Sequence, residues 1–309
     1  MYIWILRRIG SGVIVIISVM VIVFMLLRIL PGDPVALIAP NARPEEKEKL
    51  REKLGLKDPL PIQLLHYVNG LAHGDLGDSV YSGGKPVATL IKEAFPNTVR
   101  LSSLALVCSY LLFLPLGLLV ALRKGTAIDR AVSSMAVILQ SFPSFWVGIL
   151  LIAIFAVYLQ WFPAVGYKGP KYLVLPAITI ALSLIATIIR TTRLNMITIL
   201  MQDYIKAARA RGVANHAIIY KHALKNASLA ILTMFGLQLG ALLSGAMVVE
   251  WVFAYPGIGL LTILAVVRRD YPLVQALAIL LSALFVTINI IVDVTYTVVD
   301  PRLRKVSSN

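Results

Sequence analysis

The sequence predicts an all-α integral membrane protein with six transmembrane helices, a helical extracytoplasmic cap between helices 1 and 2, and a cytoplasmic helical loop between helices 4 and 5. Of its 309 residues, 59% are hydrophobic and only 14% are charged, with a mean hydropathy of +0.84. Soluble domains are about half apolar and a quarter charged. Lys and Arg number 29 against 15 Asp and Glu. On so apolar a chain, this excess predicts basic loops beside a membrane and no nucleic-acid partner.

The predicted spans are apolar runs with few charges. A hydrocarbon core about 30 Å thick needs about 20 apolar residues in a helix. The third run is long enough to bend, and Pro143 is the expected place. The six runs are Ile9–Ile29, Leu101–Leu122, Ala131–Gln160, Leu173–Ile189, Ala227–Val249 and Val274–Val299.

The basic residues predict the orientation, because cytoplasmic loops are enriched in Lys and Arg. With the N-terminus inside, the two short outer connections contain only Lys168, Lys171, Arg268 and Arg269. We therefore expect both termini in the cytoplasm of a bacterial or archaeal cell, and a multi-pass protein of its plasma (inner) membrane. The inner segments contain Arg7, Arg8, Arg123, Lys124, Arg130, Arg190, Arg193, Lys206, Arg209, Arg211, Lys221, Lys225, Arg302, Arg304 and Lys305.

The long segment after the first run is predicted to form the outer cap. Pro44 and the acids that follow it start a helix that ends at Gly55. A second helix covers Pro61–Ala72, and a third, around Val87–Ala94, leads into the second span. The expected domains are 1–30 (N-terminal end and first span), 31–97 (cap), 98–299 (five-span core with the loop 190–226) and 300–309 (tail).

Motifs for catalysis are missing from the sequence. There is no GxxxxGK[ST] phosphate loop and no HExxH zinc motif, and the four histidines do not cluster. Cys108 lies in an apolar run and is interpreted as a small core residue. We therefore expect no catalytic, cofactor-binding or metal-binding residue in this chain, and a transport role is favoured over an enzymatic one.

The inner connection 190–226 is the most informative segment. Apolar residues recur in it at roughly helical spacing around a central Gly212, which predicts two short helices hinged at the glycine. Small residues at 207, 208 and 210 permit close approach of another protein, and Arg209 and Arg211 offer ion pairs. A basic helix held near anionic lipid headgroups is the alternative.

Several motifs make the sequence resemble a known family. KAARARG followed by YKHALKN, at residues 206–226, resembles the cytoplasmic coupling-helix loop of permeases of binding-protein-dependent ABC importers. Together with the further motifs, it is similar to the B-type permease of the dipeptide, oligopeptide and nickel branch. Those motifs are RILPGDP (28–34), LGLKDPLPIQ (54–63), HGDLGDS (73–79), FPNTVRLS (95–102), PSFW (143–146), VVEWVFAYPGIG (248–259), RRDYP (268–272) and VDPRLR (299–304).

The resemblance implies a division of labour. An extracytoplasmic binding protein delivers the solute, this chain and a second homologous permease form the path as a heterodimer, and two cytoplasmic ABC ATPase subunits bind ATP and Mg. The general coupling pattern has Glu-Ala-Ala and then Gly, and here Lys206 replaces the acid. The residues implied to couple to the ATPases are Asp203, Ala207, Ala208, Arg209, Arg211 and Gly212.

Polar residues in the last two runs are candidates for the path or gate. A carboxylate near the bilayer centre costs about 2.5–3.5 kcal/mol on insertion scales, so Asp293 and Asn289, one turn apart, should face the bundle or water. A hydrogen-bonding role for Asp293 is favoured over a direct one. Gln238 lies inside a GxxxG motif, Gly236–Gly240, that predicts close helix packing. Ser244 follows it, and Glu250 begins an outer turn that suits a gate or a binding-protein contact.

Three other functions remain open at this point. The solute is expected to be a di- or oligopeptide, with nickel or a metal chelate as the narrower alternative. A self-sufficient secondary transporter or channel would favour inverted internal repeats, and none is evident in the sequence. A membrane sensor or scaffold would use the basic loop to dock a signalling partner.

Overall fold

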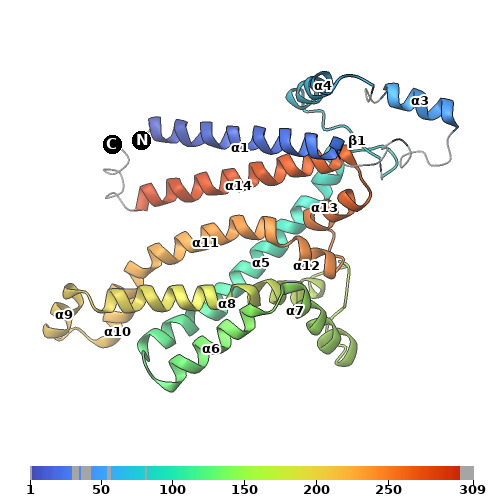
Figure 1. The fold of residues 1–309 in the computed structure, drawn as a ribbon. Coiled ribbons are helices and arrows are strands. Elements are labelled where there is room, and N and C mark those ends of the chain that lie inside the picture. The colour runs from blue at the N-terminus through green and yellow to red at the C-terminus, as the bar shows by residue number, and fades with distance from the viewer. Residues whose placement is uncertain (1, 30–34, 36–42, 54–56, 81, 300–309) are drawn as a thin grey trace. The chain divides into compact units, whose positions relative to one another are not determined.

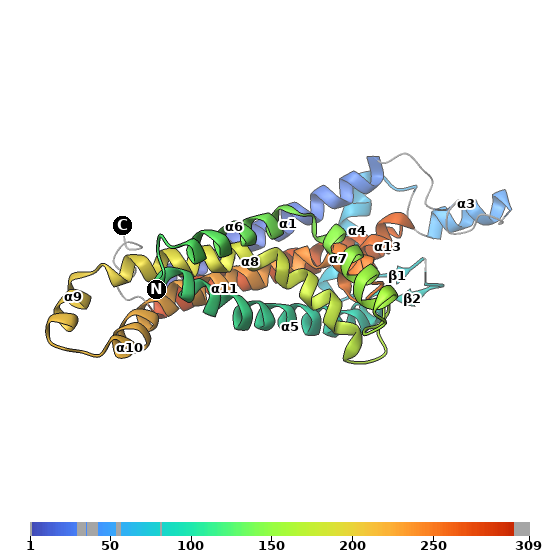
Figure 2. The same ribbon diagram turned by 90° about the horizontal axis from the view of Figure 1, so that it is seen from below.

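The computed structural model describes residues 2–29, 35, 43–53, 57–80 and 82–299, and within these ranges the side chains of 2–5, 50, 53, 229, 243–245 and 295–299 are not described. The described chain is mostly helical, and Figures 1 and 2 show its elements from two directions. Its packing divides it into two units. Unit 1 comprises Met1–Thr98 and Pro256–Thr287, and unit 2 comprises Val99–Tyr255 and Ile288–Asn309. Helices α5 and α14 each contribute to both units.

Unit 1 contains the first span and the predicted cap helices. The second cap helix begins with Pro59 before it and Pro61 in its first turn, where a missing N–H costs nothing. The predicted helix starting at Pro44 and the predicted helix ending at Ala72 are both present, whereas the predicted end of the first at Gly55 lies outside the described residues. The elements of unit 1 are α1 (Tyr2–Ile29), α3 (Pro44–Lys53), α4 (Leu60–Ala72), β1 (Asp78–Ser79), β2 (Lys85–Pro86), the start of α5 (Val87–Leu122), α13 (Ile258–Val267) and most of α14 (Tyr271–Val299).

A small hairpin, which the sequence did not predict, precedes the second span. Strands β1 and β2 pair antiparallel, with Ser79 opposite Lys85. The chain then enters α5 directly, so the helix expected around Val87–Ala94 and the second span form one continuous helix. The core of unit 1 joins this start of α5 to α13 and α14 through Val87, Ala94, Ile258, Ala265, Leu273, Ala276 and Leu277.

Unit 2 contains the remaining helices. Its elements, besides the rest of α5 and the end of α14, are α6 (Ala127–Ser141), α7 (Ser144–Leu151), η1 (Ile152–Tyr158), α8 (Lys171–Leu200), α9 (Asp203–Ala210), α10 (Asn215–Ala217), η2 (Ile218–Leu224), α11 (Lys225–Gly245) and α12 (Met247–Val252). Helices α6 and α8 lie side by side along much of their lengths (Figures 1 and 2).

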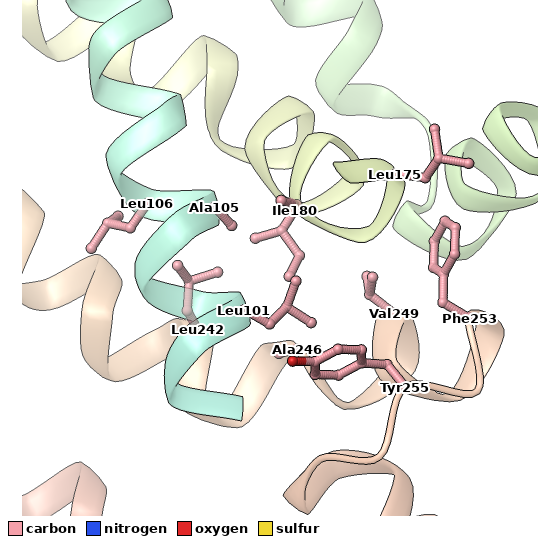
Figure 3. Close-up of a cluster of buried hydrophobic side chains, with 11 residues drawn as sticks. Leu101, Ala105, Leu106, Leu175, Ile180, Leu242, Ala246, Val249, Phe253 and Tyr255 are labelled. Carbon is pink, nitrogen blue, oxygen red and sulfur yellow. The ribbon is translucent and has the colours of Figure 1, made fainter. Parts of the chain in front are cut away.

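The largest core of unit 2 is built where α5, α8, α11 and α12 meet (Figure 3). Leu101 and Leu106 of α5 belong to this cluster with Ile180 of α8 and Leu242 of α11. Phe253 and Tyr255, which follow α12, complete it. A Cβ placed on Gly148 of α7 would lie 3.1 Å from Cε2 of the Phe253 ring, so a larger residue would require this ring to shift.

Four described helices are long and apolar enough to cross a membrane. They contain Leu6–Ile29, Val87–Leu122, Lys171–Leu200 and Tyr271–Val294. Helix α6 and the helix Ser144–Tyr158 form a bent pair, which would be a fifth span if the two helices together make one crossing. The pair bends by 96° at the break that contains Pro143. The expected bend is thus confirmed. In α11, the described apolar stretch, Ala230–Leu242, is shorter than a span, so the predicted count of six is not reached.

Candidate functional site

The loop predicted to couple to a partner forms a small packed unit at one end of α8 (Figure 2). Helix α9 leaves α8 after Met201, and α10 and η2 return the chain to α11. Ile205 and Ala208 of α9 are buried against Ile218 of η2, and Leu200 and Val213 pack around them. Two short helices around a central glycine are confirmed, with the second continuing through a π-helical turn into α11.

Gly212 ends α9 in a left-handed conformation, with φ +77°. The N–H of Gly212 donates to the carbonyl of Arg209 at 2.9 Å, and the N–H of Val213 donates to the carbonyl of Ala208 at 3.1 Å. These two bonds define a Schellman motif, which ends a helix most readily at glycine and is often accompanied by an apolar contact. Val213 supplies that contact, so the sharp turn and the small core depend on the same residues.

The residues predicted to couple separate onto two faces of α9. Asp203, Ala207, Arg209 and Arg211 are exposed, and Asp203 pairs with Lys206 at 2.8 Å. Ala208 is only 4% exposed and faces the small core. A mainly basic exposed face that includes the small residue Ala207 is therefore available to a partner, and Ala208 packs beneath it in the small core.

A hydrogen bond closes the loop at its base. The Nδ2 of Asn226, at the start of α11, donates to the hydroxyl oxygen of Tyr204 at 2.7 Å. Because η2 runs into α11 without a break, α9 is joined to a helix that extends to Gly245. The loop is thus a compact element attached to the helical bundle of unit 2 through both α8 and α11.

Gln238 lies in the interior of unit 2. Its side chain is 7% exposed, and neither amide atom has a hydrogen-bond partner among the described residues. The neighbouring Gly236 and Gly240 pack against Val292 and Ile288 of α14, and a Cβ added to either glycine would lie very close to the side chain opposite it. The predicted close packing at the GxxxG motif is thus confirmed. The side chain of Ser244 lies outside the described part of the chain.

Glu250, a residue of unit 2, is completely buried and interacts with other residues. Its carbonyl accepts a 2.7 Å hydrogen bond from the N–H of Tyr255, which closes the turn predicted after α12. Tyr255 is also fully buried, whereas Trp251 is 55% exposed. In this chain, the exposed part of the turn is thus the indole and not the carboxylate.

Asn289 and Asp293 lie one turn apart on α14, as expected from their spacing, and both belong to the part of α14 in unit 2. Their side chains are half-buried, and each interacts with other residues. In the described ranges, no three His, Cys, Asp or Glu side chains gather where a metal ion could bind.

An ion pair that the sequence did not predict joins Asp129, at the start of α6, to Arg193 of α8. The guanidinium donates through Nε to Oδ1 at 2.7 Å and through Nη2 to Oδ2 at 2.8 Å. Arg193 was counted only as a basic residue of an inner connection, and no local pattern links residues that are 64 positions apart. This bidentate geometry is the strongest form of the Arg–carboxylate contact.

Family profiles cover nearly the whole chain. Residues 114–305 match the family described as binding-protein-dependent transport system inner membrane component, and residues 1–102 match the N-terminal region of such membrane components. The chain belongs to this family. As a member of it, the protein is a membrane component of a binding-protein-dependent transport system, and the sequence resemblance is confirmed.

Full-length relatives of this inner membrane component have similar sequences. A probable peptide ABC transporter permease protein, y4tP, of Sinorhizobium fredii is 39% identical over 98% of this chain and 100% of its own length. The oligopeptide transport system permease protein AppB of Bacillus subtilis is 34% identical over 97% of this chain and 99% of its own. The glutathione transport system permease protein GsiC of Escherichia coli is 38% identical over 97% of this chain and 98% of its own.

A solved structure supports the fold of this inner membrane component. A chain of the MetNI methionine ABC transporter, in an inward-facing conformation, aligns with a TM-score of 0.54 at 20% identity. The alignment covers 67% of this chain and 97% of the other. The helical core is thus an ABC permease fold.

Proposed function

We propose that this chain is one of two permease subunits of an ABC importer for di- or oligopeptides. The observation that carries the proposal is full-length similarity, at 34–39% identity, to permeases named for peptide, oligopeptide and glutathione transport. All of these solutes are peptides or peptide-like, so a peptide is favoured over nickel or a metal chelate. The chain would form half of the path and would perform no chemistry itself.

The membrane arrangement in this proposal has six spans. Helix α11 would supply the fifth crossing together with α12, because the two follow each other closely between Lys225 and Val252. Both termini and the loop with α9 would then lie in the cytoplasm, as the positive-inside rule requires. Helices α3 and α4 and the hairpin would lie outside, where a substrate-binding protein delivers the solute.

The exposed face of α9 is the proposed contact with an ATPase subunit. Asp203, Ala207, Arg209 and Arg211 are the contact residues, and Ala208 and Gly212 shape the element that presents them. ATP and Mg would bind to two partner ATPases. When these close, they would displace α9, and the continuous helix from Asn215 would carry the displacement into the bundle. ATP and the binding protein would bias the two states by binding them with different affinities.

Gln238, Ser244, Glu250, Asn289 and Asp293 are the proposed gate or path residues on the last two spans. Two of them, Gln238 and Glu250, are buried in the present packing. They would therefore act when α11 and α14 move against each other in the assembled heterodimer.

Reconstitution tests this function. The chain is co-expressed with its second permease and ATPase subunits, and the complex is placed in liposomes with the binding protein. We expect uptake of a labelled dipeptide that requires ATP and the binding protein. Transport by the isolated chain without ATP, or competition by nickel but not by peptides, would contradict the proposal.

A further inference from the structure

A cleft of about 470 Å³ lies between α6 and α8 and is lined by residues 129–137 and 186–194. Figure 2 shows the two helices, with α9 following the end of α8. Arg130 and Ser134 line it from α6, and Arg190 lines it from α8. All three side chains are exposed. The cleft is thus open, and its walls carry cationic and hydroxyl groups.

The charges of this cleft do not cancel. Arg193 is neutralised by Asp129, whose carboxylate also accepts a hydrogen bond from the N–H of Gly125 at 2.9 Å. Arg130 donates to the carbonyl of Gly125 at 3.1 Å. Among the described residues, neither Arg130 nor Arg190 has an acidic partner within ion-pair distance. Two positive charges therefore remain on the walls of the cleft.

The cleft continues along the two helices. A second chamber of about 290 Å³ shares Val137, Ala186 and Arg190 with the first. It contains Gln140 and Thr187, whose Nε2 and Oγ1 are 3.2 Å apart. The lining residues of α6 recur at three- and four-residue intervals, so they occupy one face of the helix.

This face differs from the opposite side of α6. Met135 does not line either chamber and is 57% exposed, as is typical of a residue facing lipid. Amide and hydroxyl groups within a span, such as those of Ser134, Gln140 and Thr187, are costly against hydrocarbon and normally face the bundle interior or water. The cleft face therefore suits an aqueous path and not the lipid.

We infer that the α6–α8 cleft is a stretch of the solute path, in which Arg190 and Arg130 bind a carboxylate of the passing peptide. The inference rests on the proposed function and extends it to named residues. Guanidinium groups match carboxylates in geometry, and an exposed site binds weakly enough to release its ligand. The shared chambers place the Gln140–Thr187 pair further along the same route, where it can exchange hydrogen bonds with peptide groups.

Thiol labelling of the assembled complex in nanodiscs tests the inference. In a Cys108→Ala background, which removes the chain's single cysteine, cysteines replace Ser134, Thr187 and, as a lipid-facing control, Met135. We expect hydrophilic reagents to modify positions 134 and 187 but not 135. At position 134, we compare the labelling rate of an anionic sulfonate reagent with that of a cationic reagent. The ratio of the two rates should be about fivefold higher when Arg190 is present than after Arg190→Gln.

Protection by substrate identifies the ligand. A saturating dipeptide with its binding protein and ATP should slow labelling at position 134, and Arg190→Lys should keep most of the anionic preference because it keeps the charge. Arg123→Gln, in the exposed turn outside the cleft, should change nothing. Labelling equal at all three positions, or protection by anionic lipid but not by peptide, would overturn the inference.

The same preparation separates the two proposals. If dipeptide uptake requires ATP but position 134 is neither accessible nor protected, the peptide importer stands and the path through this cleft fails. If uptake itself is absent, the proposed function fails whatever the labelling shows.

Discussion

Gly236 of α11 faces Val292 of α14 so closely that a Cβ on the glycine would lie 2.5 Å from the Val292 Cγ2. One turn later, a Cβ on Gly240 would lie 3.2 Å from the Cγ2 of Ile288. Small residues allow helices to approach closely in a membrane, where no hydrophobic force between helices drives their association. The pair of contacts makes this helix crossing sensitive to a single methyl group.

We therefore predict that Gly236→Ala destabilises the complex by about 1–3 kcal/mol, the usual cost of overpacking. The thermal unfolding midpoint of the detergent-solubilised complex measures the effect. Val292→Ala in the same chain should restore most of the loss, because it removes the clashing methyl groups. Gly10→Ala is the control, since a Cβ there meets nothing within 4 Å. Equal effects at positions 10 and 236 would refute the interpretation.

The Asp129–Arg193 ion pair should fix the start of α6 to α8. Because Asp129 is buried and Arg193 half-buried, Arg193→Gln leaves a carboxylate without its partner, and we expect a loss of about 1–3 kcal/mol. Arg193→Lys should lose less, since it keeps the charge but not the bidentate geometry. The same unfolding measurement applies.

The control for this ion pair is Asp203→Asn, which breaks an exposed pair with Lys206. Exposed pairs contribute little to stability, so its unfolding midpoint should stay near that of the unmodified complex. If Arg193→Gln is as mild as this control, the buried pair does not hold the two helices together.

The sequence predicted features that depend on local chemistry. It located the bend at Pro143, the glycine that ends α9, the start of a helix at Pro44 and the close-packing motif at Gly236, because proline and glycine act directly on the backbone where they stand. It did not reveal the Asp129–Arg193 pair or the burial of Glu250. Both features depend on which helices pack together. The helical periodicity of apolar residues in the sequence does not specify the neighbours of a helix.

The β1–β2 hairpin shows the same limit and gives a further prediction. The Ser79 hydroxyl donates to Oδ2 of Asp270 at 2.5 Å, across 191 positions, and both residues are fully buried in unit 1. Oδ1 of Asp270 accepts from the N–H of Leu273 at 3.3 Å in the first turn of α14. Ser79→Ala should thus destabilise the hairpin by about 1–3 kcal/mol.

Limited proteolysis of the hairpin measures this effect. We expect faster cleavage within residues 79–86 for Ser79→Ala than for the unmodified chain. Ser82→Ala is the matched control, because only the Ser82 backbone N–H bonds to Ser79. Identical cleavage rates for the two variants would show that the buried bond is dispensable.

Gly212 should be essential for coupling because of its backbone conformation and not because of crowding. A Cβ there meets nothing within 4 Å, yet φ is +77°, a region that costs other residues roughly 1–2 kcal/mol. We predict that Gly212→Val lowers substrate-stimulated ATP hydrolysis by the assembled complex about tenfold, while the chain still inserts into the membrane. Gly212→Asn should be milder, because Asn adopts this conformation more readily.

Gly125 provides the control for this last substitution. It also has a positive φ, of +80°, with open space around it, but it lies in the α5–α6 turn outside the coupling loop. Gly125→Val therefore introduces the same kind of strain without touching α9. If both valine variants reduce stimulated turnover equally, the loss reflects general strain, and the Schellman turn at Gly212 has no special part in transmitting force. If only Gly212→Val does so, the orientation of α9 sets the coupling.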